Sequence, residues 1–153
     1  MRNLDRIDRA ILAVLQVQGR IANVELAERV GLSESACLRR VKQLDELGVI
    51  SHYAAHVNAG SVGLSGTVFV NVSLADQREE SLRGFEAAIQ SVPEVMECYL
   101  MSGEVDYMLR VVVAGTSDFE RIHNQLTRLP GVARVQSSFA LRPILKRTSL
   151  PLR

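Results

Sequence analysis

The sequence predicts an α+β protein in which three short helices precede a longer segment of β-α-β-β-α-β order. Residues that commonly begin and end helices recur at short intervals up to Gly48, which predicts several short helices. A run rich in glycine and small residues follows at 58–66, and a strand–helix–strand pattern then occurs twice. We therefore expect a front domain at 1–57, a linker at 58–66 and a second domain at 67–153.

The composition is that of a globular protein. The chain has 153 residues, of which 47% are hydrophobic and 23% are charged, values typical of soluble domains. The sequence has neither a signal-peptide core nor an apolar run long enough to span a membrane, so we expect a cytoplasmic protein. A formal net charge of +1 argues against a surface that coats nucleic acid non-specifically, but it allows a local basic face.

The first helix is expected to begin at Asp5, a good N-cap residue, and to end at Gly19. Its apolar residues recur with i, i+4 and i+7 spacing, which predicts an amphipathic helix. These residues are Ile7, Ile11, Leu12, Val14 and Leu15.

Two further helices are expected between Asn23 and Gly48. Asn23 would cap the first and Gly31 would end it, while Ser33 would cap the second. Each helix has an apolar face that would pack in a three-helix core. The expected core residues are Val24, Ala27 and Val30 in the first of these helices, and Cys37, Val41 and Leu44, flanked by Leu38, in the second.

The second of these helices carries a polar, cationic face. At about 100° per residue, the residues opposite its apolar stripe are Ser35, Ala36, Arg39 and Gln43, with Arg40 and Lys42 on the flanks. A helix-turn-helix lays such a face in the major groove of DNA. The alternative is an ordinary small helical domain in which these cations form a solvated face.

Residues 48–57 follow the third helix and contain several β-branched and aromatic side chains. Such a segment after a helix stop predicts a short strand or hairpin. The front domain would then be a winged helix-turn-helix.

The second half contains an internal repeat. Six positions in the first copy recur with similar character 37 residues later: Leu82, Phe85, Ile89, Val92, Pro93 and Val95 correspond to Phe119, Ile122, Leu126, Leu129, Pro130 and Val132. The helices, expected at 78–91 and 117–129, each lie between two strands, expected at 67–74 and 95–102 and at 107–113 and 132–141. This order predicts a ferredoxin-like βαββαβ sandwich with both helices on one face of an antiparallel sheet.

The turn between the two copies, residues 101–107, contains two acidic residues next to a glycine. A short hairpin needs a positive φ, which explains Gly103. Glu104 and Asp106 would share a side in extended chain and repel each other unless a cation compensates. A ligand ammonium group could do so, while backbone N–H groups around Gly103 could hold a carboxylate. The alternative is a simple solvated turn.

The sequence offers little support for catalysis. No nucleophile elbow, Walker loop, dinucleotide fingerprint or HExxH motif occurs. His52 and His56 have the spacing of a helical metal pair, but in an extended segment they would lie roughly 13 Å apart at about 3.3 Å per residue, too far to share an ion. Cys37 and Cys98 are expected to be buried thiols. We therefore expect no enzyme, no metal site and no cofactor.

Four stretches together resemble one family. LDRIDRAIL from Leu4, VGLSES leading into CLRRVKQLDELGVI, SGEVDY from Ser102 and LPGV from Leu129 are similar to the Lrp/AsnC (feast/famine) family of bacterial and archaeal transcription regulators. The likeness covers nearly the whole chain, in order. It implies an N-terminal winged helix-turn-helix and a C-terminal, ACT-like ligand-sensing domain.

The resemblance also implies partners and sites. Sensing domains of the family pair through their sheets into homodimers, which often assemble into octamers, and amino-acid effectors bind between dimers. The matching effector residues here are Gly103, Glu104, Asp106, Ser137 and Ser138. Many relatives have Ser-Pro where this chain has Ser33-Glu34, and Gly-Asp where it has Gly103-Glu104.

The combined hypothesis is a DNA-binding transcription regulator under amino-acid control. Arg39 and Gln43 would contact base edges in double-stranded DNA, and Arg40, Lys42 and the wing would hold phosphates. The full set of expected DNA-binding residues is Ser33, Glu34, Ser35, Ala36, Arg39, Arg40, Lys42 and Gln43. A dimer would read a pseudo-palindromic operator. The alternative is an amino-acid-binding oligomeric module whose helix-turn-helix contacts protein instead of DNA.

Overall fold

The computed structural model describes residues 4–152, which fall into two compact units. The first unit contains the described residues through His56 together with those from Ile144 onward, and the second runs from Val57 to Pro143. The division lies one residue before the expected end of the front domain. Residues 144–152 were expected in the second domain but belong to the first unit.

The first unit contains three helices, α1 (Arg6–Leu15), α2 (Asn23–Val30) and α3 (Glu34–Glu46). A capping box starts α1: the Asp5 Oδ1 accepts from the Asp8 amide at 2.8 Å, and the Asp8 Oδ2 accepts from the Asp5 amide at 3.2 Å. The helix ends at Leu15, earlier than the expected stop at Gly19.

Helix α2 differs from expectation at its start and on its buried face. Its N-cap is Ala22, and Asn23 is the first helical residue. Val24 is 49% exposed, while Leu26 is buried. The expected face was therefore wrong at Val24, because the i, i+4 pair Leu26 and Val30 points into the core.

Helix α3 has the caps that its sequence predicts. Ser33 is the N-cap and its Oγ accepts from the Ala36 amide at 3.4 Å. Gly48 follows the helix with φ 66°, a conformation that glycine adopts without strain. The three helices enclose one apolar core, formed by Ile11, Leu12, Leu26, Ala27, Val30, Cys37 and Leu44.

The wing expected at 48–57 does not form. Residues 51–57 have no regular secondary structure, so the prediction of a strand or hairpin was wrong for this chain by itself. A strand needs a neighbour to accept and donate its ladder hydrogen bonds. Among the described residues of this single chain, no strand pairs with the segment.

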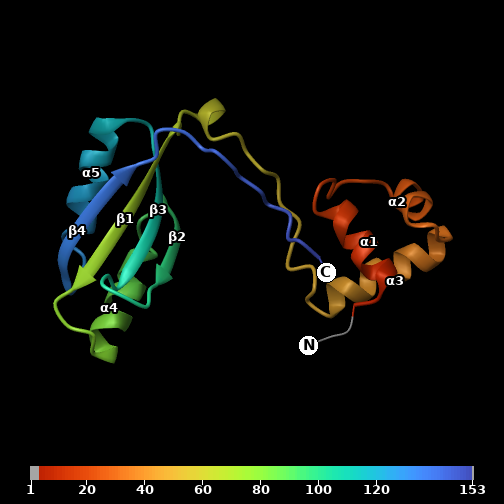
Figure 1. Cartoon of the computed structure of the whole chain (residues 1–153), viewed down its shortest axis with the longest axis horizontal. Coiled ribbons are helices and arrows are strands. Elements are labelled where there is room, and N and C mark those ends of the chain that lie inside the picture. The colour runs from red at the N-terminus through yellow and green to blue at the C-terminus, as the bar shows by residue number, and fades with distance from the viewer. Residues whose placement is uncertain (1–3, 153) are drawn as a thin grey trace. The chain divides into compact units, whose positions relative to one another are not determined.

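The second unit has the predicted β-α-β-β-α-β order after a short 3-10 turn, η1 (Gly60–Val62). Its elements are β1 (Gly66–Leu74), α4 (Glu79–Ile89), β2 (Val95–Leu100), β3 (Tyr107–Val113), α5 (Thr116–Leu126) and β4 (Val132–Phe139). The strands form one antiparallel sheet in the order β2-β3-β1-β4, and Figure 1 shows β1 and β3 at its centre. The ferredoxin-like prediction is confirmed.

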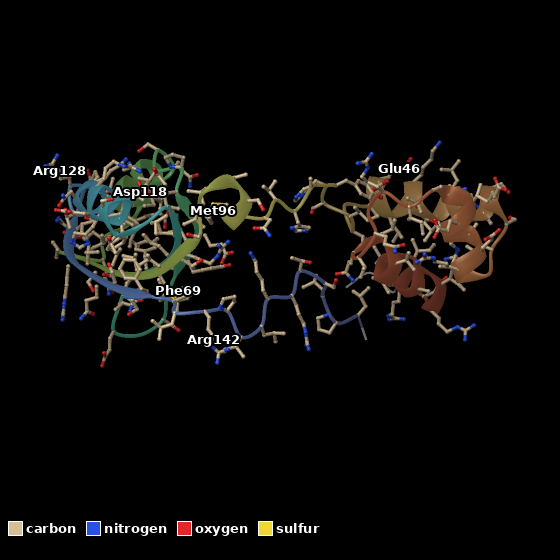
Figure 2. All side chains as sticks on the ribbon, turned by 90° about the horizontal axis from the view of Figure 1, so that it is seen from above. Glu46, Phe69, Met96, Asp118, Arg128 and Arg142 are labelled. Carbon is tan, nitrogen blue, oxygen red and sulfur yellow. The ribbon has the colours of Figure 1, made fainter. Side chains whose placement is uncertain are left out.

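The core of this unit lies between the sheet and its two helices. Along β1, Val68, Val70 and Val72 are fully buried, whereas Phe69 between them is exposed. Figure 2 shows Phe69 on the side of the sheet away from Asp118 and Arg128. The period of two places alternate side chains on opposite faces, so one sheet face is covered and the other is open.

The repeat ends its two helices in the same way. Helix α4 stops at Ile89 and α5 at Leu126, each four residues before a proline. A proline ring clashes with the carbonyl four residues earlier in a helix, so Pro93 and Pro130 set both ends. No helix within residues 4–152 combines the length and apolarity needed to cross a bilayer.

Candidate nucleic-acid interface and effector site

The polar face of α3 is open to solvent. Arg39, Lys42 and Gln43 are exposed, as are Glu34 and Ser35 in the first turn. Ala36 is partly buried, and the Ser33 hydroxyl is committed to the helix cap. The structure therefore presents the central base-reading candidates, Arg39 and Gln43, without protein in front of them in their own unit.

Arg40 is paired with two carboxylates inside its own unit. Its Nη1 donates to the Asp5 Oδ2 and to the Asp8 Oδ1, each at 2.7 Å. The guanidinium thus bridges both carboxylates of the α1 capping box and is directed toward α1, away from the face that carries Arg39. The expectation that Arg40 holds a phosphate is not supported by this geometry, because its charge is already paired inside the unit.

The pairing has an electrostatic consequence at the start of α1. Hydrogen bonds from the Asp8 amide and the Arg40 guanidinium hold the pKa of Asp5 below its usual range. These groups are solvent-accessible, so the pair contributes modestly to stability. Its larger effect is geometric, since it fixes the start of α1 against the middle of α3.

The turn between α2 and α3 is fixed by one side-chain hydrogen bond to the backbone and by a glycine at the end of α2. The Asn23 Nδ2 donates to the Glu34 carbonyl at 2.9 Å, and Gly31 closes α2 with φ 70°. Asn23 therefore ties the start of α2 to the start of α3, a role that its position in the sequence did not reveal. Together with Arg40, this contact holds α3 from both sides.

The turn between β2 and β3 is exposed at its tip. Gly103 has φ 145° and open space where a side chain would project, and Ser102 and Glu104 are exposed. The Met101 amide donates to the Asp106 carbonyl at 2.8 Å, closing the turn. The prediction that this turn needs glycine for a positive φ is confirmed.

Asp106 is buried beneath this turn and is only 8% exposed. Its Oδ2 accepts from the Leu74 amide at 2.7 Å, and its Oδ1 accepts from the Gln77 side-chain amide at 2.8 Å. Glu104 and Asp106 therefore do not form the exposed carboxylate pair that was expected. Asp106 fixes the turn to the end of β1, and nothing in the sequence pattern singled out its partner Gln77.

Ser137 and Ser138 lie in the outer strand β4, and both are exposed. Ser137 pairs with buried Val70 and Ser138 with exposed Phe69, so the two hydroxyls belong to opposite faces of the sheet. Strand β1 separates β4 from β3, which amounts to about 10 Å at about 4.8 Å per strand. One chain by itself does not bring these serines together with the turn between β2 and β3.

The open face of the sheet is partly apolar with a central ion pair. Phe69 and Tyr99 are exposed there, and the Arg110 Nε and Nη2 donate to the Glu97 Oε1 at 2.8 and 2.6 Å.

Of the two thiols, Cys37 is buried as expected, whereas Cys98 in the edge strand β2 is exposed, so that expectation was wrong for Cys98.

Both units match known protein families. Residues 4–45 match the AsnC-type helix-turn-helix domain, and residues 67–150 match the Lrp/AsnC ligand binding domain. These two matches together span most of the chain and agree with the two units of the structure except at residues 144–150, which fall in the ligand-binding match but in the first unit.

Several named proteins are similar along nearly their full length. A Bkd operon transcriptional regulator from Pseudomonas aeruginosa is 42% identical over 153 residues, covering 99% of this chain and all of that protein. The leucine-responsive regulatory protein of Salmonella typhimurium is 44% identical over 132 residues, 86% of this chain and 80% of that one. The crystal structure of a transcriptional regulator from Neisseria meningitidis in complex with L-methionine superposes with a TM-score of 0.93 at 41% identity, covering 97% of each chain. The chain belongs to the Lrp/AsnC family of transcriptional regulators, in which an AsnC-type helix-turn-helix DNA-binding domain is joined to a ligand-binding domain.

Proposed function

We propose that α3 of this regulator reads double-stranded DNA in the major groove. The observation that carries the proposal is the exposure of Arg39, Lys42 and Gln43 on one face of a helix whose other face is fixed in the core. Arg39 and Gln43 would contact base edges, and Lys42 would contact phosphate. Ser33, Glu34, Ser35 and Ala36 would approach the same groove from the start of the helix.

We further propose that two copies pair through the open faces of their sheets. Exposed Phe69 and Tyr99 give that face apolar area to bury, and a homodimer would place two α3 helices on a pseudo-palindromic operator. Such dimers would assemble further, up to an octamer, and work in the cytoplasm. Analytical ultracentrifugation of the parent and of Phe69→Asp tests the sheet-face dimer, since only the variant should sediment as a monomer.

The effector is proposed to be an amino acid bound between dimers at the turn that joins β2 and β3. The relatives' names support this class, because one is leucine-responsive and another was crystallised with L-methionine. The Gly103 backbone and Glu104 are exposed and could meet the carboxylate and the ammonium group. Asp106 would shape the turn from beneath. Because Ser137 and Ser138 lie apart from the turn in one chain, they would complete the site from a neighbouring dimer.

Selection of bound genomic fragments in the presence and absence of each amino acid tests the function as a whole. We expect a recurring pseudo-palindromic sequence whose occupancy changes with one or a few amino acids. Thermal shifts with the same panel should be smaller for Glu104→Ala than for the parent. Recovery of fragments without any common sequence would contradict the DNA-reading proposal, and equal shifts for both proteins would place the effector elsewhere.

A further inference from the structure

The C-terminal segment lies in a different unit from the one that its family match suggests. The helix-turn-helix match ends at residue 45 and the ligand-binding match runs to residue 150, yet the first unit also contains residues from Ile144 onward. The chain therefore leaves the DNA-binding unit at residue 56, forms the whole sensing unit, and returns. Figure 1 shows the last, blue segment ending at the unit that contains α1.

The glutamine that caps the C-terminal end of α1 holds the backbone of this segment. The Leu150 amide donates to the Gln16 Oε1 at 2.6 Å, and the Gln16 Nε2 donates to the Leu150 carbonyl at 3.3 Å. A side-chain amide has one acceptor and one donor side by side. Gln16 therefore pairs with both backbone groups of one residue, much as a neighbouring strand would.

Apolar packing adds a second attachment two residues later. Leu152 packs against the helical core of the unit. It also lines, with Thr148 and Leu150, a groove of about 740 Å³ whose other walls come from α1 and residues 49–56. The groove is mainly apolar where Leu12 and Leu15 form it, which suits a leucine side chain.

The two connections between the units differ in composition. The first, residues 57–65, contains Gly60 and Gly63, and glycine is the residue with the widest backbone freedom. The second, residues 140–152, contains no glycine and has prolines at Pro143 and Pro151, which restrict the backbone. The second connection also starts directly at β4, the strand that carries Ser137 and Ser138.

We propose that residues 147–152 are a built-in part of the DNA-binding unit, docked against α1 and its C-cap, and that effector binding acts on DNA binding through this second connection. The part of this proposal that concerns the effector rests on the proposed function. A change in β4 would be carried along residues 140–149 to α1, and Arg40 joins the start of α1 to α3. Chain continuity alone does not establish coupling between sites, so docking and coupling are measured separately.

Amide hydrogen exchange in the full chain tests the docking. We expect the Leu150 amide to exchange about tenfold faster in Gln16→Ala than in the parent, because its acceptor is lost. Gln18→Ala is the matched control, since Gln18 is exposed two residues further along. Equal exchange of Leu150 in the parent and in Gln16→Ala would overturn the docking.

DNA affinity with and without amino acid tests the coupling. L-leucine and L-methionine are the probes, and the ratio of Kd values on one selected fragment is the readout. In Leu152→Ser and Gln16→Ala we expect this ratio to fall to within about twofold of unity, whereas effective coupling is about 5- to 150-fold. Val62→Ser is the control, since Val62 is 58% exposed and lies in the first connection, outside the groove. Calorimetry should show unchanged binding of the amino acid to all variants.

The outcomes separate this inference from the proposed function. If the parent responds and the two groove variants respond equally, the coupling through the tail is overturned while the effector proposal stands. If neither amino acid changes the affinity of the parent for DNA, the proposed effector role fails, and the proposed coupling through the C-terminal segment fails with it. The exchange measurement decides the docking in either case.

Discussion

Arg39 and Arg40 are adjacent in the sequence, but the structure gives them opposite surroundings. Adjacent residues on a helix point about 100° apart. Arg39 is therefore exposed on the outer face of α3, whereas Arg40 is directed toward α1. The partners of Arg40, Asp5 and Asp8, lie more than thirty residues earlier. Helical periodicity identifies the face of a residue but not its tertiary partner, which is why Arg40 was grouped with the phosphate contacts.

Salt dependence of DNA binding separates these roles. Each phosphate that a protein neutralises adds about 0.9 to the slope of log K against log salt concentration. We expect Lys42→Ala to reduce the slope by about that amount. Arg40→Ala should leave the slope unchanged while lowering the melting temperature, because the tie between α1 and α3 is lost. Fluorescence anisotropy over a salt series measures both slopes, and an equal reduction for Arg40→Ala would restore it as a phosphate contact.

Asp106 is the second residue whose role depends on tertiary contacts. We expect Asp106→Ala to lower the free energy of unfolding by about 1–3 kcal/mol, because the buried Leu74 amide loses its acceptor. Glu104→Ala, two residues away and exposed, should change it by less than about 0.5 kcal/mol. Urea unfolding measures both values. Similar values for the two variants would mean that the hydrogen bonds of Asp106 do not hold the turn.

The candidate site was therefore only partly predictable from the sequence. Gly103 was identified because its backbone requirement is local. Asp106 was identified as an acidic residue, but its burial and its partner Gln77 arise only when β1 and β3 pair. Ser137 and Ser138 are neighbours in sequence, yet strand geometry assigns them to opposite faces of the sheet.

At the scale of elements, the order of helices and strands and two of the helix starts followed from local signals, whereas the end of α1 and the start of α2 did not. Caps at Asp5 and Ser33 and the prolines after α4 and α5 act within a few residues, so the sequence contains them. The expected wing at 48–57 failed because a strand is defined by its neighbour. A β-rich composition cannot supply a neighbour that the single chain does not provide.

The N-cap of α1 predicts an acid sensitivity of the DNA-binding unit. The pKa of Asp5 is lower in the folded chain than the ordinary value, so its contribution to stability is present above about pH 4 and is lost as the pH falls through the folded pKa. Asp5→Asn keeps a good cap but carries no charge. Its melting temperature should fall less than that of the parent between pH 5 and pH 2.5. Parallel curves would show that Asp5 does not titrate with folding.

Two glycines predict opposite effects on stability. Gly84 lies inside α4, and an added Cβ would meet only the Pro130 side chain at 3.9 Å. Gly84→Ala should therefore stabilise the second unit by about 0.5–1 kcal/mol through helix propensity. At Gly66 an added Cβ would lie 2.5 Å from the Val113 Cγ2 and 3.1 Å from its carbonyl, so Gly66→Ala should destabilise. Thermal unfolding measures both, and shifts of the same sign would contradict this packing.

At the scale of the whole molecule, the sequence contains a signal for the first connection between the units but none for the return of the chain. Glycines near residue 60 marked the first connection. The tail from Ile144 has neither helical nor strand periodicity, and its contacts with α1 join residues 134 positions apart. A sequence pattern contains no signal for such a contact, so the tail was assigned to the second domain.

The proposed reading of DNA depends on α3 presenting Arg39 to the duplex. The most direct measurement is the affinity of Arg39→Ala for a selected operator fragment and for a scrambled fragment of equal length, with Arg83→Ala on α4 as the control. Loss of a bidentate contact to a base costs about 1–3 kcal/mol of discrimination. We predict that Arg39→Ala loses about 5- to 150-fold of its preference for the operator, while Arg83→Ala retains it. Unchanged affinity and unchanged preference in Arg39→Ala would contradict the account.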